Sequence, residues 1–111
     1  MNLQDKQDVL TTAVEGGIGY WATITDYDRG PDGTWWRVTL APTGEPDEFE
    51  ATTVYARDLG TAADVLLEKY PRCASATALR AAKKERDMGY LDAEAADMLV
   101  QIAAFGEVVY G

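Results

Sequence analysis

The sequence contains no histidine and only one cysteine, Cys73, among its 111 residues. With a single cysteine the chain cannot form an internal disulfide, and without histidine it lacks the commonest zinc ligand. The same absences remove Ser-His and Cys-His nucleophile pairs and imidazole acid–base catalysis. Cys73 is therefore expected to be a partly buried thiol rather than a nucleophile. We expect a protein that is not an enzyme and that uses no cofactor.

Long apolar runs are missing as well, since no stretch reaches the ~18 consecutive apolar residues that favour a membrane span. The first residues, Met1 to Asp8, have neither the basic start nor the apolar middle of a secretory signal. We therefore expect no membrane association and a cytoplasmic location. The length fits a single domain over residues 1–111.

The net charge of −9 is unevenly distributed along the chain. Residues 72–86 carry five bases and one acid, whereas residues 87–111 carry five acids and no base. Arg80, Lys83 and Lys84 are spaced so that on a helix they project from one face. Such a basic stripe contacts phosphate, or it is a solvated face that interacts with acidic parts of the chain or of a neighbouring subunit. The overall negative charge favours the second interpretation and opposes direct DNA binding.

The hydrophobic periodicity predicts an α+β fold. It consists of an N-terminal helix, a three-stranded antiparallel β-meander and three helices packed on one face of the sheet. Asn2 is the expected N-cap of the first helix, over residues 3–15. Turn-rich connectors and β-branched or aromatic runs place the strands at about 18–27, 34–41 and 48–56.

The three later helices are predicted from capping residues and helix breakers. Thr61, Ser75 and Asp92 are the expected N-caps. Pro71, Gly89 and Gly106 are the expected ends. The apolar tail after Gly106 either adds an edge strand or docks on the core.

Aromatic side chains are concentrated on the expected sheet: Tyr20, Trp21, Tyr27, Trp35, Trp36, Phe49 and Tyr55. In the second strand, strict alternation places Trp36 in the core with Val38 and Leu40, and places Trp35 and Arg37 on the other face. If Trp21 and Trp35 share the face away from the helices, an aromatic surface is exposed, and such surfaces mark interfaces. The alternative is that another layer of the chain covers them. The candidate binding residues are Tyr20, Trp21, Tyr27, Trp35, Trp36 and Arg37.

The loop after the first strand resembles the first half of a calcium loop, because Asp26, Asp28 and Asp32 precede glycines. Gly30, however, removes a side-chain ligand, Arg29 adds positive charge, and Arg37 stands where an EF-hand loop has its bidentate glutamate. A hairpin turn uses the same residues for backbone reasons. We therefore favour a turn over a metal site.

The segment Glu15-Gly16-Gly17-Ile18-Gly19-Tyr20-Trp21 directly follows the amphipathic first helix. It resembles a segment of small uncharacterised proteins from phages and mobile elements of actinobacteria, and the resemblance covers mainly the first third of the chain. It implies an intracellular protein, made in the host cytoplasm during infection. Small acidic accessory proteins of that kind often bind and disable host machinery. The resemblance implies no activity.

Two functional hypotheses follow. The first is a non-enzymatic, self-associating protein that binds a host or phage protein, with its acidic surface imitating the phosphate charge of DNA as an anti-defence factor. The second is a small-ligand, nucleotide-like binder in which Tyr20, Trp21 and Trp36 pack against a planar ligand. In that case Arg37 or Arg57 holds an anionic group of the ligand.

Overall fold

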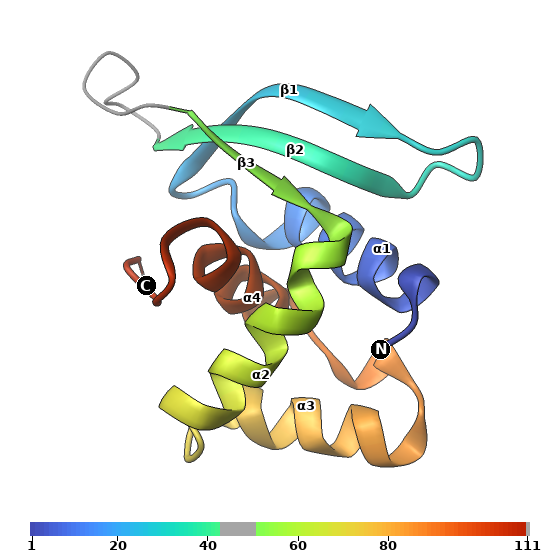
Figure 1. The fold of residues 1–111 in the computed structure, drawn as a ribbon, viewed down its shortest axis with the longest axis vertical. Helices are drawn as coiled ribbons and strands as arrows, with labels where there is room; N and C mark the ends of the chain where they lie inside the picture. Colours follow the sequence, from blue (N-terminus) through green and yellow to red (C-terminus); the bar gives the residue numbers. More distant parts are fainter. Residues whose placement is uncertain (43–50, 111) are drawn as a thin grey trace.

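A computed structural model describes residues 1–42 and 51–110 of the chain and confirms the predicted α+β architecture (Figure 1). Helix α1 (Leu3–Thr12) is followed by strands β1 (Ala22–Arg29), β2 (Trp35–Pro42) and β3 (Thr52–Tyr55). Helices α2 (Leu59–Lys69), α3 (Ala74–Glu85) and α4 (Ala93–Phe105) complete the fold. Three short helical segments connect these elements: η1 (Ala13–Gly17), η2 (Ala56–Asp58) and η3 (Met88–Tyr90). The first part of the predicted third strand, including Phe49, lies outside the described residues.

The sheet has the order β1-β2-β3 with antiparallel pairing throughout. The helices lie on one side of it, and within residues 1–42 and 51–110 no helix covers its other face (Figure 1). Val38 of β2 stands opposite Tyr27 on one side and Val54 on the other, so these residues share the helix-facing surface. Arg37 stands opposite Asp28 and Tyr55, and these three share the open face.

The core lies between the sheet and the helices. Every helix and every strand contributes to it, which explains why a chain of this length forms a single apolar cluster. The largest apolar side chains with relative exposures below two per cent are Leu10, Ile18, Val38, Leu40, Val54, Leu59, Leu66, Leu79, Leu99 and Val100.

Two predicted helix starts and two predicted helix ends are confirmed. Helix α2 ends at Lys69, and Pro71 directly follows its C-cap Tyr70. Asn2 Oδ1 accepts a hydrogen bond from Asp5 N at 2.8 Å, and Asp5 Oδ2 accepts one from Asn2 N at 3.0 Å. Asp92 caps α4 by accepting from Ala95 N at 2.9 Å. Gly106 ends α4 with φ of 81°, a conformation that glycine adopts without strain.

The caps predicted for the two middle helices are wrong. Helix α2 begins at Leu59, two residues before Thr61, because the short helix η2 leads directly into it. Helix α3 begins at Ala74, and Cys73 rather than Ser75 is its N-cap, with Sγ accepting from Ala76 N at 3.3 Å. Helix α3 also ends at Glu85, ahead of the expected Gly89, because Arg86 adopts the left-handed conformation with φ of 54°.

Strand β1 begins at Ala22 rather than at Ile18, because residues 18–21 form a turn in which Ala22 N donates to Ile18 O at 2.9 Å. Helix α1 continues into this turn as a π-helix, η1, which ends at Gly17. Such π-helical turns are rare and are often found at functional sites. Gly17 allows η1 to approach α4 closely, since a Cβ there would lie 2.7 Å from Ala93 O.

This close approach predicts that Gly17→Ala lowers the free energy of unfolding by about 1–3 kcal/mol, because one of the two backbones must move. Gly16→Ala is the matched control. Its Cβ would meet only the Cβ of Ala93 at 3.8 Å, an ordinary contact. We expect the Gly16 variant to be at least as stable as the parent in urea denaturation. Equal losses in both variants would contradict the packing described here.

Candidate functional site

The candidate binding residues lie in three separate places. Tyr20 and Trp21 are in the turn before β1 and contact α4. Tyr27 and Trp35 pack together at the far end of the β1–β2 hairpin, with ring centroids 4.9 Å apart. Arg37 lies on the open face of the sheet, and Trp36 precedes it at the start of β2. The alternative in which Trp21 and Trp35 form one exposed aromatic face is therefore not observed.

Trp21, for which the sequence left both exposure on an aromatic face and cover by another layer of the chain open, is buried. Its relative exposure is 3%, and its indole Nε1 donates to Asp97 Oδ1 of α4 at 2.7 Å. The ring lies between Tyr110, stacked at 5.0 Å, and Phe105 at 5.6 Å. The alternative interpretation, in which other parts of the chain cover the aromatic rings, is therefore confirmed for Trp21.

Trp35 and Trp36 have exchanged the positions predicted for them. The pairing skips Trp36, since Asp28 stands opposite Arg37 and Arg29 opposite Trp35. This β-bulge reverses the alternation at the start of β2. As a result Trp35 packs against the core, whereas Trp36 has a relative exposure of 45%.

Trp36 belongs to an exposed group that we call the Trp36 patch, formed by Leu3, Trp36, Tyr55 and Arg57. These side chains border a hollow of about 260 Å³ between the start of α1 and the end of the sheet, with Arg37 also in its wall. Leu3 was not identified from the sequence as a binding residue, because only the packing of α1 beneath the sheet brings it to this place.

Two contacts fix the aromatic rings of the Trp36 patch. The indole of Trp36 lies directly on Gly30, where a Cβ would come within 2.6 Å of Nε1. The guanidinium carbon of Arg57 lies 4.4 Å from the centroid of the Tyr55 ring, a cation–π contact. Among the described residues, Arg57 has no carboxylate partner within salt-bridge distance. Its charge therefore remains available to a ligand or partner.

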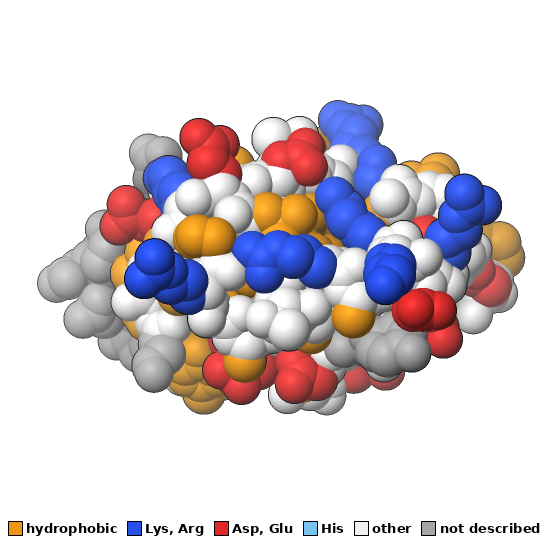
Figure 2. Space-filling model, turned by 90° about the horizontal axis from the view of Figure 1, so that it is seen from below, with side chains coloured by type: hydrophobic (Ala, Val, Ile, Leu, Met, Phe, Trp, Pro, Cys, Tyr) orange, Lys and Arg blue, Asp and Glu red, His pale blue; other side chains and the backbone are white. Residues whose placement is uncertain are grey.

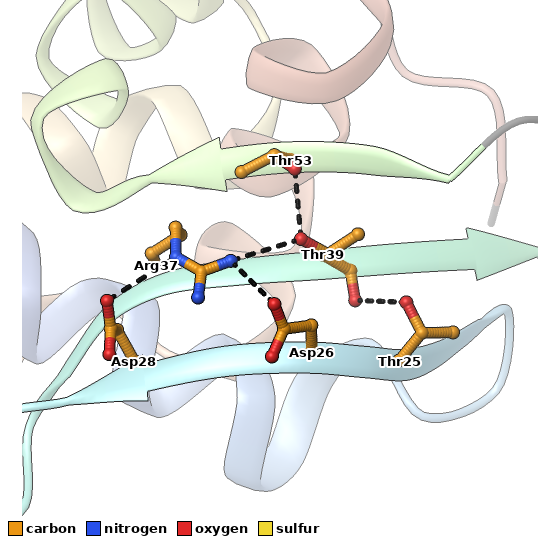
Figure 3. Close-up of polar contacts among 6 residues, drawn as sticks. All are labelled: Thr25, Asp26, Asp28, Arg37, Thr39 and Thr53. Carbon is orange, nitrogen blue, oxygen red and sulfur yellow. Dashed lines mark hydrogen bonds and ion pairs between the residues drawn. The ribbon is translucent and has the colours of Figure 1, made fainter.

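A polar network covers the open face of the sheet (Figure 3). Arg37 donates to Asp26 Oδ2 at 3.2 Å, and its Nε lies 3.6 Å from Asp28 Oδ2. The hydrogen bond to Asp26 raises the pKa of Arg37. Between β2 and β3, the hydroxyl groups of Thr39 and Thr53 are hydrogen-bonded at 2.9 Å. Exposed ion pairs of this kind add little stability, so the network mainly fixes the direction of the Arg37 side chain.

The three aspartates of the loop that resembles a calcium loop interact with other side chains. Asp26 and Asp28 are paired with Arg37, and Asp32 Oδ1 accepts from both N and Oγ1 of Thr34. These hydrogen bonds from Thr34 lower the pKa of Asp32. Over the described ranges 1–42 and 51–110, no cluster of three or more carboxylate or thiol side chains is suited to a metal ion.

The basic stripe lies on α3, and lysine and arginine side chains gather on the underside of the molecule (Figure 2). Lys83 Nζ lies 3.7 Å from Asp64 Oδ1 of α2, and Arg80 donates to Pro71 O at 2.6 Å. Lys84 makes no ion pair with a described residue. Two of the three bases thus contact neighbouring parts of the same chain.

Tyr20 points its hydroxyl group at α4 although its ring is exposed. The hydroxyl donates to Asp97 Oδ2 at 2.6 Å, while 59% of the residue surface remains accessible. Burial of the phenolic end, together with the hydrogen bond to Asp97 and the charges of Asp97 and Glu94, raises the pKa of Tyr20 to about 12. Tyr20 is therefore a poor nucleophile or base near neutral pH.

Gln101, on the next turn of α4, holds the tail of the chain. The residue is fully buried, and its Oε1 accepts from the backbone N–H groups of Val109 and Tyr110 at 2.8 and 2.7 Å. Its Nε2 donates to Asp97 Oδ1 at 2.9 Å and to Tyr110 O at 3.1 Å. Of the two alternatives for the tail, docking on the core is the one observed.

No protein-family model, curated protein or solved structure matches the chain at a significant level. Within the described part of the chain, no helix is both long and apolar enough to span a bilayer. The geometry also brings together no activated nucleophile and base among the side chains described above. The described surface has exposed aromatic rings next to charged side chains that are held in position by contacts within the chain.

The Tyr20–Asp97 contact predicts a specific loss of stability at high pH. Folding raises the pKa of Tyr20 from 10.0 to about 12, so the folded state favours the protonated phenol. The resulting stabilisation is fully present below pH 10.0 and is lost as the pH rises through about 12. Tyr20→Phe should lack this pH dependence in urea denaturation. Tyr27→Phe, which removes a hydroxyl from outside the Asp97 network, should retain it. Identical pH profiles for Tyr20→Phe and the parent would contradict the assignment.

Proposed function

We propose that the chain is a non-enzymatic protein-binding module and that the Trp36 patch is its recognition surface. The observation that carries the proposal is the exposure of a tryptophan, a tyrosine and an arginine around one hollow. Tryptophan, tyrosine and arginine are the residue types that most often dominate binding energy at protein interfaces. In the proposed complex, a partner places an apolar side chain against Leu3 and Trp36 and a carboxylate against Arg57.

The fixed geometry of the Trp36 patch supports this proposal. Trp36 rests on Gly30 and Arg57 rests on Tyr55, so neither side chain loses much conformational freedom when a partner binds. The adjoining open sheet face is polar, as the rim of an interface commonly is. The hollow and this face together provide an apolar centre with a hydrophilic border.

The DNA-mimic hypothesis gains less support. Asp26 and Asp28 would contribute to a phosphate-like surface, but both are paired with Arg37. The basic side chains on the underside also weaken a consistently negative surface (Figure 2). Phage origin and an anti-defence role therefore stay predictions from the sequence, and the proposal is limited to protein binding.

Self-association also stays a prediction, and the Trp36 patch is a better site for it than the edge of β1. Pairing two β1 edges in antiparallel register would bring Asp26 and Asp28 close to their counterparts, and like charges oppose such pairing. Light scattering over a range of protein concentrations tests the prediction. A monomer at every concentration would contradict self-association, and the proposed partner would then be a different protein.

A second candidate function is the binding of a small planar anion in the same hollow. It is favoured because Trp36, Arg37 and Arg57 line the same hollow. The ligand-binding hypothesis from the sequence had Trp36 pack against the planar ligand and Arg37 or Arg57 hold its anionic group. Tyr20 and Trp21 are not part of this site, because they contact α4. Thermal-shift measurements with nucleotides test this function: a rise in melting temperature that Arg57→Gln abolishes supports it. Unchanged melting temperatures at millimolar ligand would exclude it.

For protein binding, we expect Trp36→Ala to weaken capture of a specific partner by tenfold or more, since loss of a central tryptophan costs about 2 kcal/mol or more. Tyr27→Ala is the control, because Tyr27 is an exposed aromatic residue of the same sheet that does not line the hollow. Quantitative pull-down at two salt concentrations, with melting temperatures to check folding, measures the difference. If Trp36→Ala and the parent capture the same proteins equally, the Trp36 patch is not the recognition surface.

A further inference from the structure

A second hollow lies between η1, α4 and the tail of the chain, and it shares no lining residue with the Trp36 patch. Its volume is about 570 Å³. We call it the Tyr20 hollow, and its walls include Gly16, Gly17, Tyr20, Glu94, Met98 and Tyr110. The two glycines have no side chains, so the aromatic and acidic side chains provide the groups of the hollow that can interact with a ligand.

The ring of Tyr20 is held rigidly in the wall of this hollow. Its hydroxyl group is bonded at 2.6 Å to Asp97, whose carboxylate also accepts from Trp21 and Gln101. The side chain therefore cannot turn into the core, and more than half of its surface stays accessible. The hollow thus has a fixed aromatic ring beside Tyr110 and the polarisable thioether of Met98.

The charged side chains that line the Tyr20 hollow, Glu94 and Asp97, are both acidic. The ammonium group of Lys69 donates to Gly106 O at 3.1 Å but is not part of the lining. The hollow is built from residues 16–20 and 93–110, and these two segments contain no lysine or arginine. Glu94 is exposed and has no ion-pair partner among the described residues. Its charge reaches the ring, because it contributes to the raised pKa of Tyr20. Asp92 caps α4 and so offsets the positive end of the helix beside Glu94.

We propose that the Tyr20 hollow binds an organic cation, namely the ammonium or guanidinium group of a lysine or arginine side chain on a partner protein. The cation lies against the ring of Tyr20 and pairs with the carboxylate of Glu94, a combination that favours cations over neutral groups of equal size. The alkyl stem of the side chain packs against Met98 and Tyr110. The hollow has room for this stem as well as for the charged group. The site is independent of the Trp36 patch, so either can be present without the other.

The experiment is a titration followed by nuclear magnetic resonance with three capped tripeptides, Gly-Lys-Gly, Gly-Arg-Gly and Gly-Gln-Gly. We expect the two cationic peptides to shift the backbone resonances of residues 16–20 and 93–98, and the neutral peptide to leave them unchanged. Glu94→Gln should weaken the binding of the cationic peptides about fivefold, a factor that corresponds to the loss of one close charge contact. Glu85→Gln, which removes an exposed acid on α3, is the matched control and should change the affinity less than twofold.

Three outcomes would overturn the proposal. One is the absence of any shift at millimolar cationic peptide, and another is an equal loss in the Glu94 and Glu85 variants, which would indicate only the overall negative charge. The third is tighter binding of free choline than of the peptides, which would assign the hollow to a small-molecule cation.

Tyr20→Leu gives a second test, with its melting temperature as the folding control. It should weaken peptide binding, and unchanged affinity would contradict the role of the ring.

Discussion

The buried carboxylate of Asp97 is the constraint on which the rest of the structure depends. Burying a charge this deeply is unfavourable unless its oxygens are filled by hydrogen bonds, and here Tyr20, Trp21 and Gln101 fill them. Tyr20 and Trp21 belong to the turn before β1, and Gln101 of α4 holds the tail of the chain. The network therefore joins the turn before β1, helix α4 and the docked tail at a single point, and it fixes the direction in which β1 leaves the helical layer.

The two proposed binding surfaces follow from this arrangement. With β1 fixed, the sheet lies with one face on the helices, and its other face has no helical cover (Figure 1). The bulge at Trp36 then turns one large ring outward at the end of that sheet. Near the other end of β1, the same bond that satisfies Asp97 keeps the ring of Tyr20 accessible. One surface offers Arg57 and the other Glu94, neither of which is ion-paired with a described residue, so the two surfaces differ in the partners that they attract.

Local signals in the sequence predicted the order of the elements, the caps at Asn2 and Asp92 and the helix end at Gly106, because propensity and turn chemistry act over a few residues. The predicted position of Trp36 on the core face was wrong, because one β-bulge reverses the alternation of side chains between the two faces of the sheet. The burial of Trp21 depends on Asp97, 76 residues away. One signal for that site was present: Asp97 and Gln101 lie four residues apart on the apolar side of an otherwise well-patterned helix.

The most direct test is the free energy of unfolding of Asp97→Ala, measured together with acrylamide quenching of Trp21 in a chain that carries Phe in place of Trp35 and Trp36. Alanine removes both carboxylate oxygens, so Trp21 Nε1, Gln101 Nε2 and the hydroxyl of Tyr20 lose the acceptor that they share. We expect a loss of about 3 kcal/mol relative to the same chain with Asp97, since buried donors are left without this acceptor, and we expect quenching of Trp21 to increase. Unchanged stability with Trp21 still shielded would contradict the central role of this carboxylate.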